Sequence, residues 1–484
     1  MVSFAPLDWL VFAVFIAGIL ALGFSVKLRE AGILQFLAAG RSLTLPLFVT
    51  TLVSTWYGGI LGIGESVSYF GLGTILLLGV PYYAFALIYA LFYAKKVREA
   101  DQISIPERIE LVFGKKNGVL AGGLIFLLGV PAAHALMIGT LIQSFTGWSL
   151  VPCIVLAGLV GAVFLWKGGL LADVRVSVLA FIMMYVGFAV MVIANLSWKP
   201  PAEAWNGLGD AMNSFTGGNG IVPIVTFFIL GAWTLIDPGF HQRVASAKDP
   251  QTSYKGILVS IGFWMLFDVL SVTTGMYAMS RLDPMPENPL LIFPLFGDLA
   301  LPAGLKAVFF CGMLGTILSA MVGYTLVSGA SIGRDIVSRL RANHDETKWT
   351  RIGLVLSLIV AIVLATQIQS VVSLWYAWGG AVIGALLIPV SLSYGLMRKW
   401  RPNSGSVSLS VIIAAVVSFA WLGYGLATNN PYLNVRIPES WTILGLGGTD
   451  VSIGTLLPGL IISAIILAFG PKKDENERYE PVSE

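Results

Sequence analysis

Residues 54–65 read Ser54-Thr55-Trp56-Tyr57-Gly58-Gly59-Ile60-Leu61-Gly62-Ile63-Gly64-Glu65, with four glycines inside seven positions of an otherwise apolar stretch. Each glycine lowers helix stability by about 1 kcal/mol relative to alanine. A helix predicted over residues 45–70 should therefore be interrupted near its middle. A second apolar stretch, residues 220–238, has the same character. It contains Gly231-Ala232-Trp233 and then Asp237-Pro238-Gly239, where proline removes a backbone donor.

Apolar stretches of this length account for nearly the whole chain. Hydrophobic residues make up 56% of the 484 residues and charged residues only 11%, whereas a globular protein carries about 25% charged residues. A helix needs about 20 apolar residues to cross a bilayer core. We therefore predict an all-α integral membrane protein with about 13 transmembrane helices, over residues 8–26, 45–70, 73–94, 117–146, 148–166, 176–197, 220–238, 256–280, 303–330, 352–368, 373–397, 407–428 and 452–470.

The basic residues orient these spans. All but four of the 29 Lys and Arg residues fall in alternate connections, and the exceptions are Lys199, Arg281, Lys306 and Arg436. The positive-inside rule assigns the basic connections to the cytoplasm. An odd number of spans then puts the N-terminus outside and the C-terminus in the cytoplasm, and the expected location is the plasma (inner) membrane. The net charge of +3 reflects these connections and does not suggest a nucleic-acid partner.

The spans divide into two sets of five, over residues 45–197 and 220–397, and each set opens with one of the interrupted helices. Residues 1–44 add one helix and a cytoplasmic loop, 198–219 form an extracellular loop, 398–470 add two helices, and 471–484 form a cytoplasmic tail. Two glycine-rich helices in matching positions of two halves indicate a transporter site. Close packing of membrane helices explains the glycines equally well.

Two carboxylates and a histidine lie deep inside predicted spans, namely Asp268, Glu65 and His134. A charge at membrane depth costs at least about 2.5–3.5 kcal/mol, so each one needs a reason. Cation coordination, proton relay and substrate hydrogen bonding are functional reasons, and a buried network that joins helices is the structural one. Asp237 and Asp173 lie nearer the cytoplasmic ends of their spans. There we expect them to cap helices or to pair with Arg243 and Arg175.

Residues 315–331 form a hydroxyl-rich span that includes Thr316 and Ser319. Sodium requires several oxygen ligands, and a helix hydroxyl together with backbone carbonyls freed by an interrupted helix can supply them. Ser319 facing the interruption in residues 45–70 would make such a site. Tight packing of small residues is the alternative explanation.

Five short motifs then follow one another in an order that resembles the sodium:solute symporter family. They are Gly40-Arg41-Ser42-Leu43, Ser104-Ile105-Pro106-Glu107-Arg108 followed by Phe113-Gly114, Gly168-Gly169-Leu170, Gln242-Arg243 with Ala245 and Ala247-Lys248, and the run from Ser319 to Asp335-Ile336. Each motif alone is weak, but five in order are specific. The resemblance covers the first eleven spans.

The resemblance implies a LeuT-type fold, in which two inverted five-helix repeats each begin with a broken helix, here spans 2 and 7. It also implies uptake coupled to sodium. The family's sodium site uses backbone carbonyls of the first broken helix and carbonyl and hydroxyl oxygens of the eighth core helix. Carried over, these positions are Ser54, Tyr57, Thr316, Ser319 and Ala320.

The sequence departs from the family pattern at this site. Ala320 lacks the hydroxyl that most members carry there. Members with an additional sodium use an Asp where this chain has Ser177, and two hydroxyls where it has Val322 and Gly323. We therefore expect one sodium ion per transport cycle, while a weakened site would also be compatible with proton coupling through Glu65 or Asp268.

Substrate contacts are expected where the two broken helices meet, near the midplane of the membrane. The candidates are Thr55, Trp56, Glu65, Trp233, Thr234, Asp268, Trp375 and Tyr376. Some of these aromatic residues could instead belong to the interfacial belt.

The leading hypothesis is sodium-coupled symport of a small organic solute, such as a sugar, amino acid, carboxylate or vitamin. A proton-coupled or uncoupled carrier and a non-transporting sensor are the alternatives. No enzyme motif is found, Na⁺ is the only expected cofactor, and a monomer is sufficient, although an oligomer is compatible with the sequence.

Overall fold

The computed structural model is mostly helical and describes residues 1–25, 33–342, 345–397, 399–428, 430, 433–440, 448 and 450–473. Within these residues, eleven helices are long and apolar enough to cross a membrane. They are Pro6–Phe24, Leu45–Phe70, Ile75–Phe92, Lys115–Thr146, Gly169–Leu196, Ile221–Ala245, Pro250–Arg281, Leu305–Leu340, Glu346–Gln367, Val371–Ser393 and Ser404–Ala427. The prediction of a helical, multi-pass membrane protein is thereby confirmed.

The first part of the chain forms α1 (Pro6–Phe24), α2 (Ile33–Ala38), η1 (Ala39–Arg41), α3 (Leu45–Trp56), η2 (Tyr57–Gly59), α4 (Ile60–Phe70), η3 (Ile75–Gly79), α5 (Val80–Phe92), α6 (Ala94–Glu99), α7 (Ile105–Phe113), α8 (Lys115–Leu128), α9 (Ala132–Thr146) and α10 (Leu150–Leu196). The middle part forms α11 (Pro201–Ala204), η4 (Asn206–Leu208), α12 (Gly209–Asn213), α13 (Ile221–Leu230), η5 (Gly231–Leu235), α14 (Pro238–Ala245), α15 (Pro250–Arg281), η6 (Pro289–Leu291), α16 (Ile292–Ala300), α17 (Leu305–Ala330), η7 (Ser331–Val337) and α18 (Ser338–Leu340).

The last part forms α19 (Glu346–Gln367), α20 (Val371–Ser373), η8 (Leu374–Gly379), α21 (Gly380–Ser393), α22 (Ser404–Ala427), β1 (Asn434–Arg436), β2 (Asp450–Ser452) and α23 (Leu456–Phe469). Segments labelled η are 3-10 turns, except η3, η7 and η8, which are π-helical. Strands β1 and β2 pair antiparallel, with Asn434 opposite Ser452. This small hairpin is a departure from the predicted all-helical chain.

Two of the predicted spans correspond to shorter apolar helices. Span 148–166 overlaps Leu150–Leu159, and span 452–470 overlaps α23. The first belongs to α10, whose backbone leaves helical geometry at Gly169 (φ 52°, ψ −150°) before it continues to Leu196. The exact number of 13 spans therefore stays a prediction. The predicted tail falls mostly on residues 474–484, which lie outside the described residues.

The two segments that should be interrupted differ in degree. Helix α3 passes through the 3-10 turn η2 into α4, and the backbone stays close to helical, with φ −81° and ψ 13° at Tyr57. Helix α13 passes into the 3-10 turn η5, and Asp237 then adopts an extended conformation (ψ 118°) before Pro238 begins α14. The second segment therefore leaves helical geometry at Asp237, whereas the first changes helix type for a single turn.

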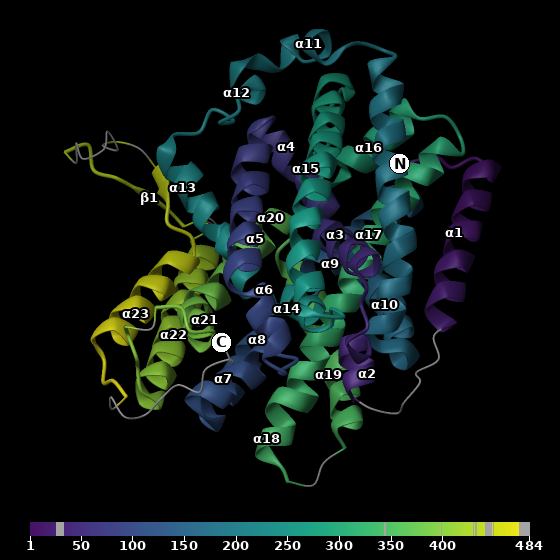
Figure 1. The fold of residues 1–484 in the computed structure, drawn as a ribbon. Coiled ribbons are helices and arrows are strands. Elements are labelled where there is room, and N and C mark those ends of the chain that lie inside the picture. The colour runs from purple at the N-terminus through teal and green to yellow at the C-terminus, as the bar shows by residue number, and fades with distance from the viewer. Residues whose placement is uncertain are drawn as a thin grey trace.

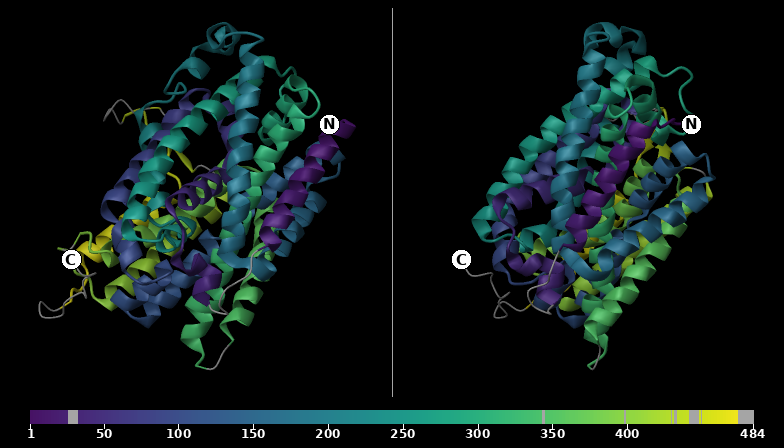
Figure 2. Two further views of the ribbon diagram at one scale, coloured as in Figure 1. Left: turned by 45° about the vertical axis from the view of Figure 1, so that its right-hand side comes forward. Right: turned by 90° about the vertical axis from the view of Figure 1, so that its right-hand side faces the viewer.

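The helices pack into a long bundle, with α10, α15 and α17 near its centre and α1 at one edge (Figures 1 and 2). Helices α22 and α23 lie on the opposite side from α1, and α11 and α12 cover one end. Small residues allow α10 and α17 to approach closely, as a Cβ added at Gly312 would lie 2.7 Å from the carbonyl oxygen of Met183. Such close contact between backbones is typical of membrane helices.

The end of the bundle that carries α7 and α18 lies opposite α11 and α12 (Figure 1), and its connections contain ion pairs. Arg334 pairs with Glu107 at 2.9 Å and links η7 to α7. Arg41 donates to Asp101, and this charged partner holds the pKa of the Asp101 carboxyl below its usual value. These pairs hold the connections together outside the apolar part of the bundle.

Candidate functional site

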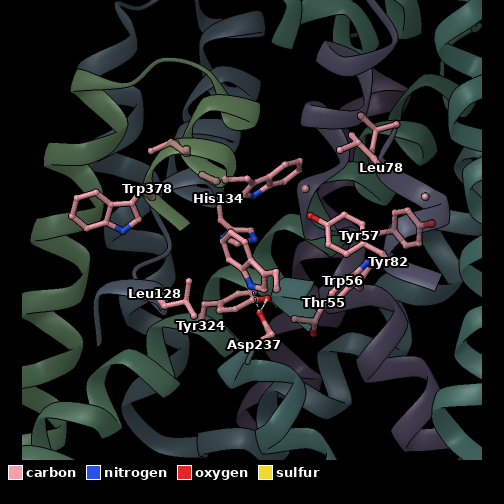
Figure 3. Close-up of a pocket in the computed structure, with 18 of the residues that line it drawn as sticks. Thr55, Trp56, Tyr57, Leu78, Tyr82, Leu128, His134, Asp237, Tyr324 and Trp378 are labelled. Carbon is pink, nitrogen blue, oxygen red and sulfur yellow. Dashed lines mark hydrogen bonds between the residues drawn. The ribbon is translucent and has the colours of Figure 1, made fainter. Parts of the chain in front are cut away.

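A cavity of about 120 Å³ lies between α3, α5, α9, α15, α17 and the non-α segments η2, η5 and η8 (Figure 3). It is lined by Thr55, Trp56, Tyr57, Gly59, Ile63, Leu78, Gly79, Tyr82, Tyr83, Leu128, Val130, Ala132, Ala133, His134, Trp233, Asp237, Asp268, Tyr324, Leu374, Trp375 and Trp378. Most of the wall is aromatic or aliphatic, with a few polar groups. Solute sites in proteins usually have this composition.

Both predicted interruptions contribute to this wall. Tyr57 and Gly59 come from η2, and Trp233 comes from η5. The glycines of η2 also serve close packing, because a Cβ added at Gly58 would lie 2.1 Å from the Cβ of Ala320. A Cβ added at Gly59 would lie 2.3 Å from the ring of Trp375. Of the two explanations of this glycine-rich stretch, close packing describes these contacts, and the transporter site stays a prediction.

The structure brings together five of the eight predicted substrate residues at the cavity, namely Thr55, Trp56, Trp233, Asp268 and Trp375. The other three lie elsewhere. Thr234 is fully buried, and the Tyr376 hydroxyl lies 2.8 Å from Ser452 Oγ of β2.

Glu65 does not line the cavity and has a structural environment. Its carboxylate accepts hydrogen bonds from Ser370 Oγ at 2.5 Å and from the backbone N–H groups of Val371 and Val372 at 3.0 and 3.2 Å. These donors form the start of α20, where free N–H groups favour a negative charge. Of the two explanations for a buried Glu65, a network that joins helices describes these contacts.

Asp268 reaches the cavity from the middle of α15. One carboxylate oxygen accepts from the Tyr57 hydroxyl at 2.8 Å, and the other accepts from the Tyr83 hydroxyl. The Tyr57 hydroxyl is also 2.8 Å from the carbonyl oxygen of Trp264. Asp268 therefore joins α15 to η2 and α5 while it faces the cavity.

Asp237 lies at the base of the cavity in the view of Figure 3, beneath Tyr324 and His134. It caps α14 through a 2.6 Å hydrogen bond from the backbone N–H of Phe240, as the sequence predicted. Its other oxygen accepts from Trp233 Nε1 at 2.9 Å and from the Tyr324 hydroxyl at 2.7 Å. The broken segment after η5 is thus tied to α17 through this carboxylate.

A buried polar cluster lies next to Thr55, and Ser319 is part of it. Ser319 Oγ is 2.8 Å from Ser177 Oγ, and 3.3 Å from both Thr55 Oγ1 and Asp173 Oδ1. Arg243 Nη2 donates to Asp173 Oδ2 and to Thr55 Oγ1, each at 2.7 Å. Asp173 and Arg243 are almost completely buried, so the pair is shielded from solvent.

This pairing corrects one prediction from the sequence. Asp173 was expected to cap a helix or to pair with Arg175, but Arg175 donates to Ser25 Oγ. Asp237 was expected to cap a helix or to pair with Arg243; it caps α14, and Arg243 pairs with Asp173. Asp173 therefore pairs with a residue of another helix and not with its neighbour in sequence, because a buried carboxylate requires a buried cation.

The remaining predicted sodium residues surround this cluster. Ser54 Oγ donates to the carbonyl of Thr50 at 2.8 Å, and Thr316 Oγ1 donates to that of Met313 at 2.9 Å, so both hydroxyls are used within their helices. Ala320 packs against Gly58. Of the predicted sodium residues on α17, Ser319 is therefore the one whose side-chain oxygen faces α3.

Sequence reasoning missed three tyrosines of the wall, Tyr82, Tyr83 and Tyr324. Aromatic residues are common throughout membrane spans, so residue type alone gave no signal. His134, which the sequence did single out, stacks on Tyr324 with ring centroids 5.3 Å apart and lines the cavity.

Solved structures resemble this chain over nearly its whole length. A Na⁺-coupled sialic acid symporter in a substrate-bound, outward-open state matches with a TM-score of 0.72 and 15% identity, over 98% of this chain and 99% of that one. A transporter of the nucleobase-cation-symport-1 family, in a closed conformation with bromovinylhydantoin bound, matches with a TM-score of 0.56 and 17% identity, over 91% and 95%. At these identities the likeness concerns the fold.

Two curated relatives are each named high-affinity choline transporter 1. The protein from Drosophila melanogaster is 22% identical over 414 residues, which cover 79% of this chain and 65% of the relative. The protein from Caenorhabditis elegans is 21% identical over 374 residues, which cover 71% and 64%. This chain therefore spans slightly less than two thirds of the length of either relative.

A family model described as the sodium:solute symporter family matches residues 36–392. The match includes the cavity, the cluster around Ser319 and most of the candidate membrane helices. Because it covers well over half of the sequence, the chain belongs to the sodium:solute symporter family.

Proposed function

We propose that this chain is a sodium-coupled symporter that takes up a small organic solute by alternating access. The observation that carries the proposal is the cavity, which is lined by both segments that change helix type and lies next to the Ser319 cluster. Transporters place solute and coupling ion at such non-helical segments near the midplane, because the freed backbone groups can bind them there.

We further propose the LeuT-type arrangement of two inverted five-helix repeats, over residues 45–197 and 220–397. The changes of helix type at η2 and at η5 support it, since each occurs in the first long helix of its set. The two ends of the bundle support an external N-terminus. The basic connections around α7 and α18 lie at the end opposite α11 and α12, which belong to the proposed external loop 198–219 (Figure 1).

The proposed sodium site lies between α3 and α17. Backbone carbonyls near Ser54 and Tyr57, the carbonyl of Thr316 and the hydroxyl of Ser319 are its ligands, and Ala320 supplies no side-chain oxygen. Support comes from the 3.3 Å distance between Ser319 Oγ and Thr55 Oγ1, which brings the two helices together at this level. Arg243 supports a single ion, because its guanidinium already balances Asp173.

One sodium ion is sufficient for useful uptake. One charge that moves down 100 mV releases about 2.3 kcal/mol. A tenfold inward sodium gradient adds about 1.4 kcal/mol. The sum, about 3.7 kcal/mol, could concentrate a neutral solute several hundredfold. A second ion is therefore not required by energetics.

The test is uptake into proteoliposomes that contain the purified protein, across a panel of sugars, amino acids, carboxylates and choline. Choline belongs in the panel because both curated relatives are named for it. Sodium and pH gradients are imposed separately at a fixed membrane potential. We expect accumulation of one solute only when the sodium gradient points inward. Accumulation driven by a pH gradient alone would refute sodium coupling and favour the proton-coupled carrier.

A further inference from the structure

We propose that the cavity binds a small organic cation and that Asp268 recognises its positive charge. This inference rests on the function proposed above, since it names the chemical class of the solute. Four observations carry it: the charge of the wall, its aromatic residues, one unpartnered polar group and the size of the cavity.

The wall carries a negative charge that nothing in it balances. The Asp268 side chain is only 6% exposed, and its two oxygens accept hydrogen bonds from the neutral hydroxyls of Tyr57 and Tyr83. Among the described residues that line the cavity there is no Lys or Arg. A buried carboxylate without a cationic partner is strongly unfavourable. A cationic solute would supply that partner from the cavity side.

The second carboxylate of the wall has a different role. Asp237 accepts three hydrogen bonds, from the Phe240 backbone, the Trp233 ring and the Tyr324 hydroxyl. These contacts hold Trp233 and Tyr324 in place and leave Asp237 little capacity for a solute. The nearby Arg243 guanidinium also offsets part of its charge, and Asp268 remains the carboxylate available to a ligand.

Aromatic rings make up much of the cavity wall to which Asp268 belongs. Trp56, Tyr82, Tyr83, Trp233 and Trp375 all line the cavity. Trp56 and Tyr82 meet edge to face, with centroids 5.2 Å apart and an interplanar angle of 81°, so they form a corner. The face of a Trp or Tyr ring attracts a cation, and the attraction grows when the cation is removed from water. A carboxylate inside an aromatic enclosure therefore favours an alkylammonium group over a neutral or anionic one.

His134 gives the solute a second polar contact. Its side chain is 9% exposed, it lines the cavity, and its Nδ1 has no hydrogen-bond partner. A buried ring nitrogen without a partner costs free energy that a solute hydroxyl or carbonyl would recover. The cavity of about 120 Å³ is smaller than the usual 300–1,000 Å³ of drug-sized sites. A compact ammonium compound with one hydrogen-bonding group matches these features.

The competing occupant of Asp268 is a proton. A protonated carboxyl would make the wall neutral, and neutral solutes would then bind as well as cationic ones. Choline and 3,3-dimethyl-1-butanol separate the two cases, because they share shape and hydroxyl but differ by a positive nitrogen in place of carbon. The measurement is the dissociation constant of each for the purified full-length protein in detergent, with sodium present.

We expect choline to bind at least about tenfold more tightly than its neutral isostere. Equal affinities would overturn the proposal, as would tighter binding of the isostere. This comparison uses the unmodified protein, so it does not depend on whether any variant folds.

Substitution of Asp268 then tests the residue. Asp268→Asn keeps the size and one acceptor oxygen but removes the charge, and we expect choline to bind at least about tenfold more weakly. The control is Asp249→Asn on the same helix, since Asp249 caps α15 outside the cavity and Asn caps helices equally well. Unchanged choline affinity in folded Asp268→Asn would overturn the role of Asp268.

Binding in detergent needs no ion gradient, so the two proposals fail separately. Choline binding without sodium-driven uptake would refute the proposed coupling and leave the cation site standing. Sodium-driven uptake of a sugar, with no binding of choline, would refute the cation site and leave the symporter standing.

Discussion

Gly58 lies in the 3-10 turn η2, where its Cα faces α17, and Gly58→Ala tests how closely these two elements must approach. The added Cβ would lie 2.1 Å from the Cβ of Ala320 and 3.2 Å from two atoms of the His134 ring. Carbon atoms in contact are normally about 3.5–4.0 Å apart. The methyl group must therefore push η2 and α17 apart by roughly 1.5 Å.

Overpacking of this kind costs about 1–3 kcal/mol. We therefore expect Gly58→Ala to lower the thermal unfolding midpoint of the purified protein. The shift also displaces Tyr57 and Gly59, which line the cavity. Because misplacement of a binding group by about 1 Å can cost a factor of 10², we expect sodium-driven uptake to fall by at least about tenfold.

A second substitution makes the explanation specific. Ala320→Gly removes the methyl group that the new Cβ meets, so the double variant Gly58→Ala/Ala320→Gly retains only the 3.2 Å contacts with His134. We expect it to regain most of the lost stability. Gly123→Ala in α8 is the matched control, because its Cβ would meet nothing within 4 Å. The reasoning fails if Gly58→Ala unfolds at the wild-type midpoint, or if Ala320→Gly gives no recovery.

Three further predictions concern the polar groups. Ser319→Ala should raise the sodium concentration for half-maximal uptake, and Ala320→Ser should lower it. Ser328→Ala is the control and should leave this concentration unchanged, because the Ser328 hydroxyl donates to the Phe126 carbonyl. An unchanged value for Ser319→Ala removes this residue from the sodium site. Arg243→Gln should destabilise the protein by about 3–5 kcal/mol because it leaves a buried carboxylate unpaired, and Asp173→Asn added to it should recover much of that loss in thermal unfolding. Failure to recover would mean that the Arg243 contacts with Thr55 and Thr51, rather than the ion pair, dominate. Glu65→Gln should cost about 1–3 kcal/mol, because the amide loses an acceptor for the N–H groups at the start of α20; solute affinity should stay unchanged in a binding assay, and a large loss of affinity would show that Glu65 acts on the solute.

Much of the fold was predictable because apolar length and lipid thickness are directly related. All eleven helices that qualify as spans among the described residues begin or end within a few residues of predicted ones, and α1 and α22 are examples. The interruption at Asp237-Pro238 was predictable for a local reason, as proline cannot donate to the preceding turn. At Gly58 the effect of glycine is mostly on packing, and that depends on Ala320, which lies hundreds of residues away in sequence.

The site was only partly predictable. Asp268 and His134 could be predicted as candidate site residues, because an ionisable group inside a membrane span is costly and is kept only where it has a partner or a function. Glu65 gave the same signal, yet its carboxylate caps α20, and a buried polar group with a structural partner has the same sequence signature as one that binds a solute. The tyrosines of the wall gave no signal.

The sequence alone determined that the chain is a bundle of membrane helices of the symporter family, because apolar runs and ordered short motifs are properties of neighbouring residues. Only the tertiary structure decided which buried charges meet. Asp173 is two residues from Arg175 but pairs with Arg243 on another helix, and Asp268 meets tyrosines rather than a cation. The partner of a buried charge is set by how helices cross, and local sequence does not contain that geometry.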